Sequence, residues 1–228
     1  MIGRLARPIL PASCVLCAAA AEDAALCSAC REALPRLPDE RCPVCAAPSP
    51  GNAVCGACLA EPPAFARTRA ALAYTFPVDA LIHAFKYAGD LPVGETLAAL
   101  LRDAVHEGPR PDAIVPMPLH PARLRERGFN QALELARRLG QGLGIPVLAR
   151  ACRRLRDTPP QASLPWNERQ GNIRGAFACE ADLSGKHVAV VDDVMTTGHT
   201  MNELARALTR AGAGDVSCWV VARTIRKR

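Results

Sequence analysis

The chain has 228 residues, half of them hydrophobic, and its formal net charge is +6. This length allows one or two domains with an apolar core. The sequence has no run of 18 or more apolar residues, which argues against a membrane-spanning helix. The N-terminal segment lacks the apolar stretch of a signal peptide, so we expect a cytoplasmic protein.

The positive charge is concentrated in one part of the chain. Residues 1–60 carry equal numbers of basic and acidic side chains, whereas residues 120–156 carry nine arginines against only two glutamates. Such a local excess favours an anionic partner, either a phosphorylated sugar or a nucleic acid backbone.

The first part of the chain contains a cysteine repeat. Four Cys-x-x-Cys pairs are present, and the spacing of the first two pairs recurs 28 residues later. In a chain without an export signal, this pattern favours metal ligation over disulfides. We expect two structural zinc sites; the repeat favours sequential pairing, interleaved pairing is open, and iron–sulfur ligation is the alternative. The predicted ligands are Cys14, Cys17, Cys27, Cys30, Cys42, Cys45, Cys55 and Cys58.

A short proline-rich segment at residues 61–63 marks the end of this region. We therefore expect two domains, residues 1–61 and residues 62–228. In the second, we expect strands over 70–76, 113–116, 188–191 and 216–221, and helices over 78–87, 94–107, 130–139 and 200–211. This alternation predicts an α/β fold with a parallel sheet flanked by helices. Residues 157–177 lack periodicity, and we expect a long loop there.

The most informative motif follows the third of these strands. Residues 188–191 form a continuous apolar run, as a buried parallel strand does, and Asp192 and Asp193 come next. Ligands of such sheets bind at the carboxyl ends of strands, and helix N-termini attract phosphate. We expect the two carboxylates, the candidate catalytic residues, to contact ribose hydroxyls or help hold Mg²⁺. The candidate phosphate-binding residues are Thr196, Thr197, Gly198, His199 and Thr200.

Residues 188–200 resemble the phosphoribosyl diphosphate (PRPP) motif of type I phosphoribosyltransferases. Residues 116–131, residues 158–177 and the paired cysteines are similar to the ComF/GntX family of competence and DNA-utilisation proteins. The resemblance covers nearly the whole chain. It implies a type I phosphoribosyltransferase-like parallel sheet flanked by helices and preceded by a small, Cys-rich double zinc ribbon.

The resemblance also implies roles for two basic segments. A basic loop after the strand at 113–116 would bind pyrophosphate, with Arg127 and Gly128 as the main candidates, because guanidinium groups suit phosphate. A solvated basic face is the alternative. Lys86 would reach a phosphate, or would only complement the end of its helix.

The long loop at residues 157–177 matches the position of the lid that closes over PRPP in the resembling enzymes. Such lids exclude water from a reactive sugar. The resemblance implies that Arg169 and Asn172 face the ligand, and Gln161 is a further candidate. Trp166 would stack on a base or anchor the lid.

Three functions stay open at this stage. The first is a Mg²⁺-dependent phosphoribosyltransferase, a glycosyltransferase that uses PRPP and an unknown acceptor. The second is a non-catalytic module that binds single-stranded DNA, and the third is a PRPP-sensing regulator. The family association implies a role in DNA uptake or utilisation during competence, with PRPP or another phosphoribosyl ligand, single-stranded DNA and a competence helicase as candidate partners.

Overall fold

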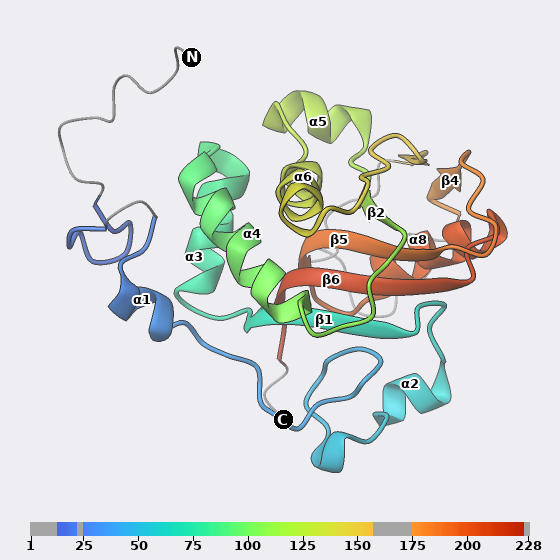
Figure 1. Ribbon diagram of the computed structural model, residues 1–228, viewed down its shortest axis with the longest axis horizontal. Coiled ribbons are helices and arrows are strands. Elements are labelled where there is room, and N and C mark those ends of the chain that lie inside the picture. The colour runs from blue at the N-terminus through green and yellow to red at the C-terminus, as the bar shows by residue number, and fades with distance from the viewer. Residues whose placement is uncertain (1–12, 22–24, 157–174, 226–228) are drawn as a thin grey trace.

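The computed structural model describes residues 13–21, 25–156 and 175–225. Its centre is a four-stranded parallel sheet (Figure 1). In spatial order the strands are β1 (Arg67–Ala73), β6 (Asp215–Arg223), β5 (His187–Met195) and β2 (Ala113–Pro116). Because all four strands run in the same direction, their carboxyl ends meet at one edge of the sheet.

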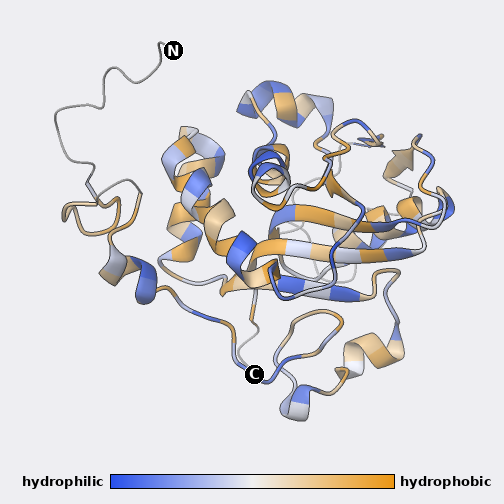
Figure 2. Cartoon of the chain, in the orientation of Figure 1, coloured by the Kyte–Doolittle hydropathy of each residue, from blue (hydrophilic) through white to orange (hydrophobic). Residues whose placement is uncertain are grey.

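The two central strands are buried on both faces, which explains their continuous apolar sequences. In β5, Val188 and Val190 pack into the core on one face, and Ala189 and Val191 pack into the core on the other. Figure 2 shows that hydrophobic residues dominate β5 and β6.

Helices cover both faces of the sheet, as the alternating pattern predicts. The helices α3 (Val78–His83), α4 (Leu91–Val105) and α6 (Gln131–Leu143) contribute to the core on one face. Helix α8 (His199–Arg210) contributes to the core on the other. The expected start of α6 is confirmed, because the Asn130 side chain accepts hydrogen bonds from two backbone amides of its first turn.

Several elements differ from the sequence prediction. The strand expected over 70–76 begins and ends three residues earlier, and the helix expected over 78–87 is divided into α3 and a π-helical turn, η2 (Ala84–Ala88). Strand β5 continues past residue 191 to Met195, so the two aspartates lie within the strand and not after it. The short antiparallel pair β3 (Cys152–Arg154) and β4 (Phe177–Cys179) was not predicted, because three residues are too few for a recognisable pattern.

The prediction of a basic loop around Arg127 was wrong, because a helix, α5 (Pro121–Arg127), occupies this position. Its local signals are a proline in the first turn, a His120 side chain that accepts a hydrogen bond from the Ala122 amide, and Gly128 in the left-handed conformation after the last residue. The sequence prediction overlooked these helix signals, because the many arginines of this segment suggested a solvated loop.

The cysteine-rich segments are two copies of one structural unit, as the 28-residue repeat predicts. Isolated bridges join Ser13 to Ala20 and Arg41 to Pro48, positions that differ by the repeat length. The same offset relates α1 (Ser28–Glu32) to α2 (Gly56–Ala60). The second copy also contains a short 3-10 helix, η1 (Pro50–Asn52).

The two units pack at separate places on the sheet domain (Figure 1). The first lies against α4: the Ala25 amide donates to Thr96 Oγ1 at 3.3 Å, and Arg31 Nη2 is 3.0 Å from Asp103 Oδ2. The second is joined to the end of β6, where Arg223 Nε donates to the Cys45 carbonyl at 2.8 Å. Nowhere in the described parts of the chain does a helix have the length and apolar character that crossing a bilayer requires.

Candidate phosphoribosyl site and zinc centres

The turn between β5 and α8 depends on a glycine. Gly198 precedes the first residue of α8 and has a φ of +87°, which side chains other than glycine adopt at a cost. A Cβ atom at this position would lie 2.9 Å from Met195 Cε. The His199 amide donates to Thr197 Oγ1 at 3.4 Å, and Thr200 lies in the first turn of the helix. The turn therefore presents backbone amides at a helix N-terminus, an arrangement that suits a phosphate group.

The two carboxylates near the end of β5 have different surroundings, because successive side chains of a strand point to opposite faces. Asp193 is buried, with 3% of its surface exposed, and its Oδ2 is 2.8 Å from Lys86 Nζ. Asp192 is less buried, and its Oδ1 accepts a hydrogen bond from the Asp193 amide at 2.9 Å. As the structure stands, Asp192 is the more accessible of the two predicted ribose contacts.

The charges at this edge shift the ionisation of two groups. Burial, and then the neighbouring charge of Asp193, raise the pKa of Asp192 to about 7. Burial favours a lower pKa for Lys86, but the carboxylates of Asp193 and Asp192 outweigh it and raise the Lys86 pKa. The site thus holds a charged ammonium group paired with Asp193, and a second carboxyl group, that of Asp192, whose pKa is near neutral.

Arg127, at the end of α5, belongs to the same cluster. Its Nη1 donates to Gln131 Oε1 at 2.6 Å, and its guanidinium carbon lies 5.1 Å from the centroid of the Tyr87 ring. Its positive charge also acts on Lys86. The structure therefore brings together predicted site residues from η2, α5 and β5, namely Lys86, Arg127, Asp192 and Asp193.

The predicted lid is described only at its end. Arg169, Asn172, Gln161 and Trp166 lie outside the described residues. From Gly175 onward the chain is described, and the Gly175 amide donates to Glu203 Oε1 of α8 at 2.7 Å.

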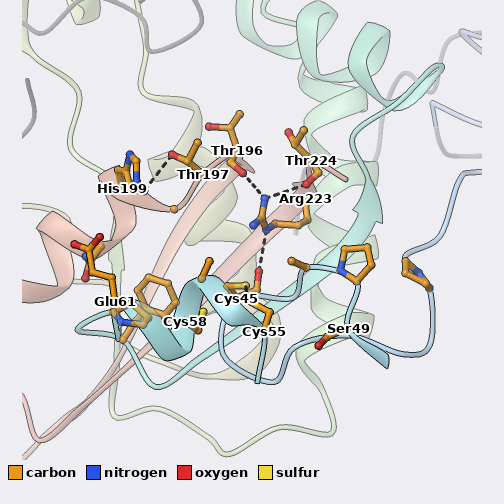
Figure 3. Close-up of a pocket in the computed structure, with 18 of the residues that line it drawn as sticks. Cys45, Ser49, Cys55, Cys58, Glu61, Thr196, Thr197, His199, Arg223 and Thr224 are labelled. Carbon is orange, nitrogen blue, oxygen red and sulfur yellow. Dashed lines mark hydrogen bonds between the residues drawn. The ribbon is translucent and has the colours of Figure 1, made fainter. Parts of the chain in front are cut away.

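Arg223, which the sequence interpretation missed, contacts the start of residues 196–200, the turn between β5 and α8 that we call the phosphate turn. It is the last residue of β6, is 6% exposed and donates to the carbonyl oxygens of Met195 and Thr196 (Figure 3). The available signal was a charged residue at the end of an apolar strand, which by itself does not distinguish a buried arginine from a solvated one.

The eight cysteines of the repeat form two groups of four, in the sequential order that the repeat favours. Within each group the sulfur atoms all lie within 4.8 Å of one another, and the groups are Cys14, Cys17, Cys27 and Cys30, then Cys42, Cys45, Cys55 and Cys58. A tetrahedral zinc ion with zinc–sulfur distances of about 2.3 Å requires sulfur–sulfur distances of about 3.8 Å. The Cys17–Cys27 and Cys45–Cys55 sulfur distances are 3.7 and 3.6 Å, so both groups fit zinc.

The first cysteine of each group has a lowered pKa. Burial opposes ionisation of Cys14 and Cys42, but hydrogen bonds from backbone amides outweigh it and lower their pKa values to about 6 and about 7. The leading donors are the amides of Cys27 and Cys55, which are equivalent positions of the repeat. Because zinc binds thiolates, the backbone prepares the first cysteine of each group for the metal.

A cavity of about 740 Å³ lies between the second cysteine unit and the phosphate turn (Figure 3). Phe65, Cys45 and prolines of the second unit line it on one side, and Thr196, Thr197 and His199 line it on the other. The second cysteine unit is thus a direct neighbour of the candidate phosphate site.

Comparison with known proteins supports this two-part organisation. The sequence model of the double zinc ribbon domain matches residues 5–59, and that of the phosphoribosyl transferase domain matches residues 124–228. Together with the parallel sheet and its flanking helices, these matches identify a phosphoribosyltransferase-like fold with a cysteine-rich zinc ribbon at its N-terminal end.

The curated relatives are named for DNA utilization or for competence. A DNA utilization protein of Salmonella typhimurium is 35% identical over 93% of this chain and 90% of its own length. Competence protein F of Haemophilus influenzae is 36% identical over 66% of this chain and 69% of its own length. Competence protein ComFC of Streptococcus pneumoniae is 26% identical over 89% of each chain.

Solved structures overlap with part of the chain. A purine phosphoribosyltransferase of Pyrococcus horikoshii is 22% identical, with coverage of 57% of this chain and 71% of that chain and a TM-score of 0.38. The match to a UMP synthase of Leishmania donovani, at 19% identity and a TM-score of 0.38, covers 60% of this chain and spans about a quarter (23%) of that longer chain. The fold assignment rests on the strand order and the domain matches, not on these overlaps.

Proposed function

Because the chain belongs to the ComF/GntX family of competence and DNA-utilisation proteins, we propose that it binds PRPP or another ribose 5-phosphate ligand and acts in the uptake or use of DNA. The observation that carries this proposal is the glycine turn at the start of α8, which follows a buried parallel strand with two carboxylates near its end. The names of the relatives support the biological setting, and the phosphoribosyl transferase domain match supports the ligand class.

In this proposal the groups of the site bind different parts of the ligand. Residues 196–200 hold the 5-phosphate through backbone amides and hydroxyls. Asp192 accepts hydrogen bonds from the ribose, and Lys86 and Arg127 neutralise the pyrophosphate. Mg²⁺ would be held by the pyrophosphate with the help of Asp192, and Arg169 and Asn172 would approach from the lid over residues 157–177. The division into residues 1–61 and 62–228 and a cytoplasmic location are part of the same proposal.

A second function is favoured by a specific surface feature. Tyr87 is 63% exposed and carries over its ring the guanidinium group of Arg127, the last residue of α5. An exposed aromatic ring among cationic side chains is a platform on which an unpaired base stacks. Binding of single-stranded DNA beside the phosphate site is therefore the alternative, or the companion, of PRPP binding.

The test is a pair of calorimetric titrations, one with PRPP and Mg²⁺ and one with single-stranded DNA. We expect saturable PRPP binding that Thr197→Val weakens and that Thr209→Val preserves, because Thr209 lies at the other end of α8 and donates to the Ala205 carbonyl. Absence of PRPP binding, with DNA binding that falls steeply as salt rises, would contradict the proposal and support the nucleic-acid module alone. Pyrophosphate release from PRPP with pooled acceptor bases then separates an enzyme from a sensor.

A further inference from the structure

Arg223 is buried, and in the described structure its guanidinium group donates four hydrogen bonds, all to backbone carbonyls. Nε donates to Cys45 at 2.8 Å, while Nη1 donates to Met195 at 3.1 Å, to Thr224 at 3.0 Å and to Thr196. A guanidinium group has a fixed, planar set of donors, so it holds the carbonyls that it contacts in one mutual arrangement.

These carbonyls belong to two different parts of the protein (Figure 3). Met195 and Thr196 connect β5 to the phosphate turn, and Met195 Cε lies directly beside Gly198. Cys45 belongs to the second cysteine unit, and its sulfur is one of the four metal ligands of that unit. The buried side chain of Arg223 therefore connects Cys45, a metal ligand, to the phosphate turn.

The first cysteine unit has no such link to the phosphate turn among the described residues. The repeat makes Cys17 the equivalent of Cys45, but Cys17 is exposed, and its unit packs on α4 through Ala25 and Arg31. Of these two chemically equivalent units, the second contacts the candidate phosphate site, and no described residue of the first does.

We propose that Arg223 is a positioning residue that makes the phosphate turn depend on metal in the second cysteine unit and not on metal in the first. The inference rests on the proposed ribose 5-phosphate site. A zinc ion held by Cys42 and Cys45 would fix the tight turn between them, which Ala46 follows with a φ of +56°. Loss of that turn would remove the Cys45 carbonyl from a buried donor, which is costly, and would free Arg223 to shift away from the Thr196 carbonyl.

The experiment compares matched variants of the full chain. Cys14→Ser and Cys42→Ser each remove the first ligand of one unit, and each should lower the zinc content by one per chain. Ribose 5-phosphate binding is followed by phosphorus NMR titration. We expect Cys42→Ser to weaken binding about tenfold and Cys14→Ser to change it by less than about twofold.

Variants of Arg223 test the link without altering a metal ligand. Arg223→Gln should keep two zinc ions and a cooperative unfolding transition yet weaken ribose 5-phosphate binding about tenfold, with partial recovery in Arg223→Lys. Should Cys42→Ser fail to fold, normal binding by Arg223→Gln would still overturn the proposal.

The outcomes separate this inference from the proposed function. Suppose that the wild-type protein binds ribose 5-phosphate. If Cys14→Ser and Cys42→Ser then bind it with the same affinity as each other, or if Arg223→Gln binds it as the wild type does, the proposed coupling is wrong but the proposed phosphate site is not. If the wild-type protein does not bind ribose 5-phosphate, the proposed site fails and the coupling fails with it.

Discussion

Two neighbouring aspartates at the end of β5 show how one strand gives identical residues different properties. Asp193 is buried in an ion pair with Lys86, whereas Asp192 has a pKa raised to about 7 by burial and by the charge of Asp193. The sequence predicts both as ribose contacts, because the motif does not say which face of the strand each occupies. The structure makes Asp192 the residue whose ionisation responds to conditions near neutral pH.

This ionisation predicts a pH dependence of ligand binding. PRPP binding with Mg²⁺ should strengthen as pH rises from about 6 to about 8, because only the ionised carboxylate accepts two hydroxyl hydrogen bonds or helps hold a cation. The effect on stability has the opposite sign. The pKa of Asp192 in the folded state lies above that of an unfolded carboxyl group, so between these two values the folded state binds a proton that the unfolded state has lost. The contribution of Asp192 to the free energy of unfolding therefore falls as pH rises from about 4 to about 7.

Calorimetric titrations at three pH values compare the wild-type protein with Asp192→Asn. The variant should lack the step near pH 7 and retain only the dependence that comes from the phosphates of the ligand. Equal pH profiles for the two proteins would show that Asp192 does not titrate at the ligand.

Much of the fold is predictable at the scale of single elements, where the pattern is long enough. The apolar run of β5 and the Asn130 cap of α6 mark their elements at or within a few residues of the observed start. Helix α5 was missed because its arginines suggested a solvated loop, and β3 and β4 were missed because each has three residues. The position of Arg223 behind the phosphate turn depends on how β5 and β6 pair, a long-range contact that no local pattern encodes.

The π-helical turn η2 was also not predictable, although it places a candidate site residue. It follows α3 without interruption and ends at Ala88, before the left-handed Gly89, and Lys86 lies in its middle. Such turns are often found at functional sites. Here the turn directs the ammonium group of Lys86 to the buried Asp193.

Removing that ammonium group should be strongly destabilising. Lys86→Met leaves the Asp193 carboxylate buried without its partner, and we expect a loss of about 3–5 kcal/mol in the free energy of unfolding. The double variant Lys86→Met with Asp193→Leu should recover most of this loss, because the buried charge is gone. Denaturant unfolding measures both, and a single variant as stable as the wild type would mean that the pair is not buried in solution.

At the scale of the whole molecule, the 28-residue repeat predicts two equal units but not their unequal positions. One unit covers α4, and the other faces the phosphate turn. The sequence of the repeat does not indicate where each unit packs, because the contacts that position the units come from residues 96, 103 and 223, far along the chain.

Both units should hold metal. Elemental analysis of the purified protein should give close to two zinc ions per chain, because each group supplies four sulfur ligands at suitable spacing. Iron with visible absorbance, or one zinc ion per chain, would contradict the assignment.

The central claim is that the glycine turn at the start of α8 binds a ribose 5-phosphate group, and a matched pair of glycine variants tests it most directly. Gly198 and Gly185 both have positive φ values, +87° and +71°, but Gly185 precedes the opposite end of β5. Alanine at either position should cost about 1–2 kcal/mol of stability. In phosphorus NMR titrations with ribose 5-phosphate, the account predicts that Gly185→Ala binds like the wild type and that Gly198→Ala binds about tenfold more weakly. Equal binding by the two variants would contradict it.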